Sequence, residues 1–155
     1  MPRTGRVRKR SIKADEVFRS VLVSRFVNRL MQRGKKTTAE KIFYSALALL
    51  SPDKPQSFEI FKRALENVTP RLEVRSRRIG GATYQVPTPV RRERSEALAI
   101  RWLIGSARTK KGRPMNIKLS EEIKEAAAGS GSAVKKRETA HRMAEANKAF
   151  AHFKW

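Results

Sequence analysis

Apolar side chains recur at helical spacing through the first half of this chain, and this periodicity does most to define its fold class. In residues 17–33 they stand three or four positions apart, as they do along one face of an α-helix. Two further stripes of the same period follow. Thr37 to Glu40 matches a capping box that opens the second helix, and Ser57 is the predicted N-cap of the third. The third helix is expected to end before Pro70, because the residue preceding a proline avoids the α region.

The period then changes around Gly80 and Gly81. These glycines separate two extended runs, 72–79 and 82–86, and a two-residue Gly-Gly loop is typical of a β-hairpin because a type I′ turn needs positive φ twice. If Gly80 and Gly81 form the loop of the hairpin, Arg77 lies opposite Tyr84 in the strand pairing. Neither face of the hairpin is apolar enough to be buried, and an isolated hairpin is marginal in water. We therefore expect an arm that projects from the helices and is ordered by a partner.

Three more helices are predicted in the second half of the chain. Ser95 caps a helix that is apolar from 97 to 104 except at Arg101, so this helix is expected to be the most buried. Pro114 suits the first turn of the next helix. Ser132 is the predicted N-cap of the last, whose inward residues are Val134, Ala140, Met143 and Ala144.

The expected fold is mainly α, with about six helices, a protruding β-hairpin arm and a basic N-terminal extension. The length suits a single domain. The predicted boundaries are a basic arm at 1–16 and a helical domain at 17–155, with the hairpin at about 72–90 and the C-terminal helix at about 132–150.

The net charge of the chain narrows the classes of function that it can have. The chain has 155 residues, with 36 Lys and Arg against 14 Asp and Glu, so its formal net charge is +22. A charge of this size indicates a polyanionic partner. Nucleic acid is favoured over an anionic membrane, because the basic residues concentrate in expected loops and arms and not along an amphipathic helix. The Arg-rich start also fits an organelle transit peptide, but we favour a basic arm of the mature protein.

Catalytic and metal sites are not expected. The chain has no Cys and two His, His141 and His152, with no acidic cluster at ligand spacing. Gly34-Lys35-Lys36 lacks the spacing of a P-loop. Glu121, Glu122 and Glu125 are interpreted as acids that favour the dipole in the first turns of a helix. The sequence thus predicts neither an enzyme nor a cofactor.

Arginine-rich clusters in extended and loop segments favour RNA. Arg makes bidentate contacts with phosphate and stacks on bases, and Tyr84 stands among arginines. Generic solubilising charge is the weaker alternative. Lys35 and Lys36 fit a solvated helix end as well as a phosphate contact. The cluster residues are Arg3, Arg6, Arg8, Lys9 and Arg10 in the arm, Arg75, Arg77, Arg78, Arg91, Arg92 and Arg94 at the hairpin, and Arg108, Lys110, Lys111 and Arg113 in a loop.

Two long stretches resemble one known family. The stretch from Glu73 to Pro87 closely resembles the hairpin of the small-subunit ribosomal protein seven family, and the ending from His141 to Trp155 looks like the bacterial and plastid C-terminus of that family. Residues 20–46 match at the family's spacings as well. One departure lies before the first helix, where many relatives carry Asp-Pro and this chain has Ala14-Asp15-Glu16.

The resemblance implies a non-enzymatic, primary binder of small-subunit ribosomal RNA that nucleates assembly of the subunit head, the 3′ major domain. It also implies a cytoplasmic protein of the ribosome, with a plastid as the minor alternative, next to small-subunit proteins nine and eleven. No membrane and no homo-oligomer is expected. The arm, Lys35, Lys36, the hairpin base and the 108–113 loop would hold the RNA. The residues expected near exit-site tRNA and mRNA are Gly80, Gly81, Tyr84, Arg142 and Lys148.

Three rival functions remain open from the sequence. A DNA-compacting architectural protein would carry the same charge. An RNA-modifying enzyme is disfavoured, because neither a cofactor loop nor a catalytic constellation is recognisable. Repression of its own messenger RNA would be an additional role of a primary ribosomal RNA binder.

Overall fold

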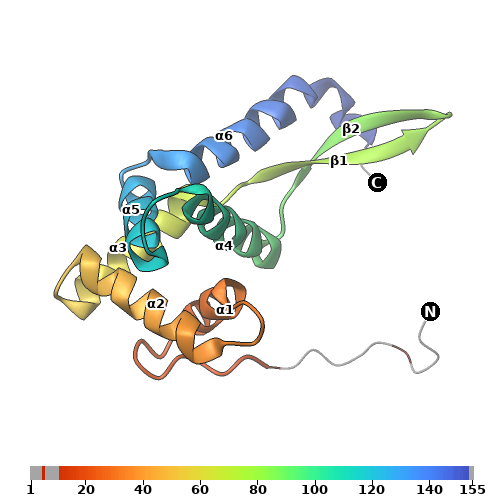
Figure 1. The fold of residues 1–155 in the computed structure, drawn as a ribbon. Helices are drawn as coiled ribbons and strands as arrows, with labels where there is room; N and C mark the ends of the chain where they lie inside the picture. The colour runs from red at the N-terminus through yellow and green to blue at the C-terminus, as the bar shows by residue number, and fades with distance from the viewer. Residues whose placement is uncertain (1–4, 6–10, 154–155) are drawn as a thin grey trace.

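A computed structural model of the chain describes residue 5 and residues 11–153, and within them helices surround one hydrophobic core while a two-stranded hairpin projects to one side (Figure 1). This confirms the predicted mainly α fold with a hairpin. The elements are α1 (Val21–Leu30), α2 (Lys36–Leu50), α3 (Lys54–Val68), β1 (Leu72–Ile79), β2 (Ala82–Pro89), α4 (Arg92–Thr109), α5 (Met115–Ala127), α6 (Gly131–Ala146) and the 3-10 helix η1 (Lys148–Phe153).

Three phenylalanines hold the first three helices together. Phe26 of α1, Phe43 of α2 and Phe61 of α3 are all fully buried, and their ring centroids lie 5.1 to 5.2 Å apart. Tilted and edge-on aromatic pairs at this separation add to the stabilisation that burial provides. Helix α4 packs against α1 and α3 of this group with Leu103 fully buried, and it has more buried residues than any other described helix, as its apolar run predicted.

Several helices begin earlier than their predicted caps. Ser57 and Ser95 lie three residues inside α3 and α4, where each hydroxyl donates to a backbone carbonyl of the same helix, Lys54 or Arg92, at 2.9 Å. A serine in the first turn can donate back to the chain in this way as well as accept at an N-cap. Helix α2 begins at Lys36, so the capping box predicted from Thr37 is wrong.

Helix α1 is shorter than the predicted 17–33. Asp15 Oδ2 accepts hydrogen bonds from the amides of Val17 and Phe18 at 3.1 and 2.9 Å, and this folds the preceding residues into a turn. Phe18 still packs against the core, stacked on Phe58 with centroids 5.0 Å apart. The apolar spacing thus identified the packing of Phe18 but not its backbone conformation.

The junction between α5 and α6 differs most from expectation. Glu122 lies in the interior of α5 and is fully buried, so its assignment to a first turn near the helix dipole is wrong. Its Oε1 accepts from the Ala133 amide at 2.9 Å, and its Oε2 lies 3.1 Å from Lys110 Nζ. Helix α6 starts at Gly131, ends at Ala146 and leaves Met143 half exposed, which corrects the prediction that Met143 points inward.

The hairpin has the predicted register, with Arg77 opposite Tyr84 and Gly80 and Gly81 both at positive φ. Its packing differs. The Tyr84 ring lies 5.2 Å from Phe150 and 5.5 Å from Phe153 of η1, and Val86 is fully buried. Figure 1 shows α6 and the C-terminal end running beside the strands while the tip extends away. The expectation that neither face of the hairpin is buried is therefore wrong at Val86, whereas the predicted projection of the hairpin is confirmed.

Candidate nucleic-acid interface

The base of the hairpin is fixed by a carboxylate between two arginines. Glu73 of β1 is almost fully buried, and its two oxygens accept hydrogen bonds from Arg75 Nε at 2.7 Å and Arg94 Nε at 2.6 Å. Burial by itself would raise the pKa of Glu73, but the hydrogen bonds and charges of Arg94 and Arg75 hold that pKa below its ordinary value. The Arg94 pair therefore attaches β1 to α4, whereas the Arg75 pair lies within β1.

The arginines that open α4 face outward. Arg91 is the N-cap residue and Arg92 the first helical residue, and the Arg92 side chain is 93 % exposed despite a 3.4 Å contact with Glu96. An exposed pair of this kind contributes little to stability. Both guanidinium groups are available to a phosphate at the point where the hairpin joins the helices.

The predicted basic loop is largely engaged within the chain. Arg108 lies in the last turn of α4, not in a loop, and its Nη2 donates to the Leu30 carbonyl at the end of α1 at 3.0 Å. Lys110 lies 3.1 and 2.9 Å from Glu122 and Glu125, and Arg113 pairs with Glu121. Burial would lower the pKa of Lys110, but the two glutamates outweigh it and raise that pKa. Lys111 is exposed, with no ion pair among the described residues.

Lys35 and Lys36 stand at the start of α2. Lys35 lines the same surface hollow as Arg108, so the fold brings these two predicted residues together. Lys36 lies 3.5 Å from Glu40, one turn along the helix, and remains 61 % exposed. Both lysines thus face outward beside the first amide groups of α2, a position that suits an anion.

The residues expected near tRNA and mRNA fall into two groups. Gly80, Gly81 and the exposed Arg78 lie at the projecting tip, whereas Tyr84 is packed against η1, whose first residue is the exposed Lys148. Arg142 is exposed on α6. Arg77 of β1 lies beside Tyr84 across the hairpin pairing. The arm residues Arg3, Arg6, Arg8, Lys9 and Arg10 lie outside the described residues.

Three arginines of α1 and α4 are absent from the predicted set. Arg25, Arg29 and Arg101 line a groove of about 300 Å³ between these helices, together with Ile12. Arg25 Nη1 donates to Glu96 at 2.8 Å, whereas Arg29 and Arg101 are exposed. A sequence signal for them existed, because Arg25 and Arg29 are one turn apart and Arg101 alone interrupts an apolar helix. These are the positions that must face solvent.

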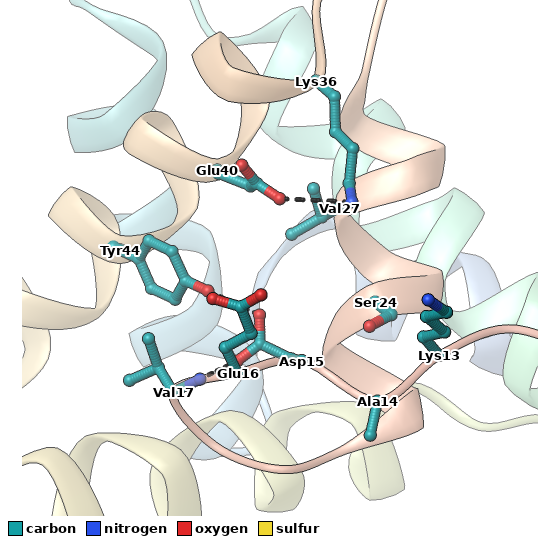
Figure 2. A pocket seen from close by; sticks show the side chains of 10 residues that line it. All are labelled: Lys13, Ala14, Asp15, Glu16, Val17, Ser24, Val27, Lys36, Glu40 and Tyr44. Carbon is teal, nitrogen blue, oxygen red and sulfur yellow. Dashed lines mark hydrogen bonds and ion pairs between the residues drawn. The ribbon is translucent and has the colours of Figure 1, made fainter.

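The root of the arm, residues 13–17, lines a second cleft, to which α1 contributes Ser24 and Val27 and α2 contributes Tyr44 (Figure 2). Tyr44 of α2 donates its hydroxyl hydrogen to Asp15 Oδ1 at 2.5 Å. Burial, then the hydrogen bond and charge of Asp15, hold the pKa of Tyr44 well above its ordinary value, so the phenol stays protonated. Lys36 and Glu40 lie at the rim of the cleft.

The remaining observations concern the histidines, acidic residues and helix lengths of the described part of the chain. Its His, Asp and Glu residues form no group of three or more arranged to hold a metal ion. None of its helices is long and apolar enough to cross a membrane. His141 serves structurally, since its Nε2 accepts a hydrogen bond from the Arg71 amide at 3.0 Å.

Comparison with known proteins identifies the family of the chain. A family model described as "Ribosomal protein S7p/S5e" matches residues 2–148. The chain is 53 % identical over 154 residues to small ribosomal subunit protein uS7 of Thermotoga maritima, covering 99 % of each chain. It is 53 % identical to the protein of the same name from Desulfovibrio desulfuricans, with both chains fully covered, and 51 % identical to that of Acidithiobacillus ferrooxidans. The chain therefore belongs to the S7p/S5e family of ribosomal proteins, structural and non-enzymatic constituents of the small ribosomal subunit that act in translation.

Proposed function

We propose that this chain is a primary binder of small-subunit ribosomal RNA that organises the RNA of the subunit head, the 3′ major domain, in the cytoplasm. One observation carries the proposal: buried carboxylates such as Glu73 and Glu122 are already paired inside the fold, while cations around the hairpin base and the α1–α4 groove remain exposed. The surplus charge is therefore on the outside, where a phosphate backbone can reach it.

The interface we propose runs along α4, from Lys35, Lys36 and Lys111 near its C-terminal end, past the α1–α4 groove, to the hairpin. Phosphate contacts are assigned to side chains that are exposed and weakly paired, and the basic residues of the arm are proposed to add further contacts. Arg75, Arg94, Arg108, Lys110 and Arg113 contribute mainly by holding the fold, because each is already bonded to a carboxylate or a carbonyl. The proposed contacts are Lys35, Lys36, Arg78, Arg91, Arg92, Lys111 and the additional Arg29 and Arg101.

The mechanism is electrostatic capture followed by fitting. Each cation that neutralises a phosphate releases condensed counterions, which supplies affinity independent of sequence. Selectivity for the head RNA over other RNA comes from the fixed spacing of the cationic contacts, since irregular RNA is recognised by the shape of its backbone and by unstacked bases. The hairpin tip, Arg142 and Lys148 extend this surface towards exit-site tRNA and mRNA, and small-subunit proteins nine and eleven are the proposed neighbours.

Salt titration of RNA binding tests the proposal. The chain should bind a fragment of head ribosomal RNA with an affinity that falls linearly on a log–log plot against salt. Replacing Arg91 and Arg92 together by Gln should reduce the slope by about one to two, because each lost phosphate contact removes about 0.7 to 0.9 from it. Filter binding across a series of chloride concentrations measures both quantities.

A matched control removes the same charge elsewhere. Arg63→Gln with Lys124→Gln changes two exposed cations on α3 and α5 that line neither the α1–α4 groove nor the cleft at Asp15, and should leave the slope close to that of the unmodified chain. An affinity that does not depend on salt would contradict the proposal. Equal affinity for duplex DNA and for the head fragment would point instead to an architectural DNA-binding protein.

A further inference from the structure

We propose, building on the RNA-binding function above, that Tyr44 is a positioning residue for the basic arm. Through its hydrogen bond to Asp15 it fixes the root of the arm on the body, so that Ile12, from which the arm starts, is held at the α1–α4 groove with Arg29 and Arg101. Tyr44 makes no ligand contact itself and acts through Asp15.

The root of the arm is held by hydrogen bonds to both oxygens of the Asp15 carboxylate. Asp15 Oδ1 accepts from the Tyr44 hydroxyl at 2.5 Å, while Oδ2 accepts from the amides of Val17 and Phe18 at 3.1 and 2.9 Å. The Asp15 amide in turn donates to the Ser20 carbonyl at 3.2 Å. Figure 2 shows Tyr44 reaching from α2 towards Asp15, which lies on the chain just before α1. Four hydrogen bonds therefore converge on one residue, and one of them ties it to a different helix.

An aromatic contact fixes the same turn. Phe18 stacks on Phe58 of α3 with centroids 5.0 Å apart and lies 6.3 Å from the Tyr44 ring. The turn is thus attached to α2 by Tyr44 and to α3 by Phe58. Its orientation relative to the core cannot change without breaking one of these contacts.

The next residues towards the N-terminus lead from this cleft to the groove. Lys13 lines the cleft that contains Tyr44, whereas Ile12 lines the α1–α4 groove with Arg25, Arg29 and Arg101. One peptide step spans only about 3.6 Å of extended chain, so the position of Asp15 determines where residue 12 enters the groove. Fixing the root therefore fixes the point from which the arm starts.

Fixing that point should increase affinity without adding a contact. A tethered group binds as if at high local concentration when its attachment matches the span to its site, and a preset exit reduces the ordering cost paid on binding. Loss of the Tyr44 hydroxyl should leave the ring packing in place and release only the root of the arm. The expected result is about a three- to tenfold weaker complex.

The experiment is a double-mutant cycle in the full-length protein, in which Tyr44→Phe is combined with removal of the positive charges of the arm. Binding to the head ribosomal RNA fragment is measured for the unmodified chain, for Tyr44→Phe, for a variant with Arg3, Arg6, Arg8, Lys9 and Arg10 changed to Gln, and for their combination. The substitution should weaken binding about three- to tenfold when the arm is charged and less than about twofold when it is neutral, because two mutations on one pathway are not additive.

Two further measurements separate positioning from general destabilisation. Amide exchange of Val17 and Phe18 should accelerate in Tyr44→Phe while that of Phe43 and Phe61 stays unchanged. Asp15→Ala, which removes the shared acceptor, should show the same dependence on arm charge. Ser120→Ala deletes a buried hydroxyl hydrogen bond on α5, 2.8 Å to the Ile117 carbonyl, and should leave RNA binding unchanged.

The outcomes are distinct. Equal weakening with the charged and the neutral arm would overturn the inference, because Tyr44 would then act on the body of the protein. Faster exchange at Val17 and Phe18 without any loss of affinity would overturn it too. Failure of the unmodified chain to bind the fragment would instead refute the proposed function, on which the inference rests.

Discussion

Substitutions at two glycines of the α5–α6 junction can distinguish the cost of backbone strain from the cost of steric crowding. Gly129 and Gly131 both have positive φ, of 76° and 92°. A Cβ added at Gly129 would meet nothing within 4 Å, whereas one added at Gly131 would lie 3.0 Å from Glu125 Cβ and 3.4 Å from Glu122 Oε1. Only the second glycine is required by its neighbours as well as by its backbone.

The Gly131→Ala variant should therefore be the more damaging one. Gly129→Ala should lower the free energy of unfolding by about 1 kcal/mol, the cost of a side chain in the left-handed region. Gly131→Ala should lower it by about 2 to 4 kcal/mol, because overpacking against α5 adds to the same strain. Urea unfolding of both variants measures the difference, and equal losses would show that Glu125 moves aside at no cost.

The neighbouring Glu122 shows what spacing cannot reveal at this scale. Glu121, Glu122 and Glu125 look alike in sequence, yet only Glu122 is fully buried. Its partners are Lys110, twelve residues earlier, and the Ala133 amide, eleven residues later. A carboxylate of this kind is identified by long-range packing, which no local pattern encodes.

At the scale of elements, a histidine couples α6 to the hairpin base. His141 Nε2 accepts a hydrogen bond from the Arg71 amide just before β1, so the ring must be neutral at that nitrogen. Burial, then the charges of Arg137 and Arg71, lower the pKa of His141 from its ordinary 6.5. The unfolded chain therefore binds a proton at a higher pH than the folded chain does.

This coupling predicts a loss of stability on mild acidification. A lowered pKa contributes stability that is present above about pH 6.5 and declines as the pH falls through the folded value. His141→Gln, which keeps an acceptor but does not titrate, should flatten the dependence of urea midpoints between about pH 7.5 and pH 5.5. The exposed His152, changed to Gln, should leave it intact, and an unaltered profile in His141→Gln would contradict the assignment.

Most elements were predictable because their signals are local, and most boundaries were not. The helical stripes and the Gly80-Gly81 turn gave the helices, the hairpin and its register. The caps were misjudged because a serine hydroxyl in the first turn donates to a carbonyl, as Ser57 and Ser95 do. The cover over Tyr84 depends on Phe150 and Phe153, more than sixty residues later, and the register alone could not indicate it.

The candidate interface divides in the same way. Charge and expected loop position selected cations such as Arg91, Arg92 and Lys111, which are exposed in the fold. They could not distinguish these from Arg94, Lys110 and Arg113, whose carboxylate partners come together only in the fold. RNA contact by any of these residues remains a prediction.

For the whole molecule, the charge of +22 has opposite effects on folding and on binding. Repulsion among excess cations opposes compaction, and salt screens it over a Debye length of about 10 Å at 0.1 M. The melting temperature of the free chain should therefore rise by several degrees between about 0.05 and 0.5 M sodium chloride, while affinity for ribosomal RNA falls.

Thermal circular dichroism in chloride checks this expectation. Sulfate is unsuitable because its exclusion from protein surfaces stabilises folded states generally. A melting temperature that falls with chloride would mean that ion pairs such as those of Glu73 and Glu122 outweigh the repulsion.

The packing of η1 on the hairpin also sets an order of events during synthesis. The strands are complete at Pro89, but Phe150 and Phe153, which cover Tyr84, are made more than sixty residues later. Chains generally fold from the N-terminus as they emerge. The hairpin of a nascent chain therefore lacks its aromatic cover until about sixty further residues have been made and have left the ribosome, so the strand that carries Tyr84 is synthesised well before the side chains that pack on it.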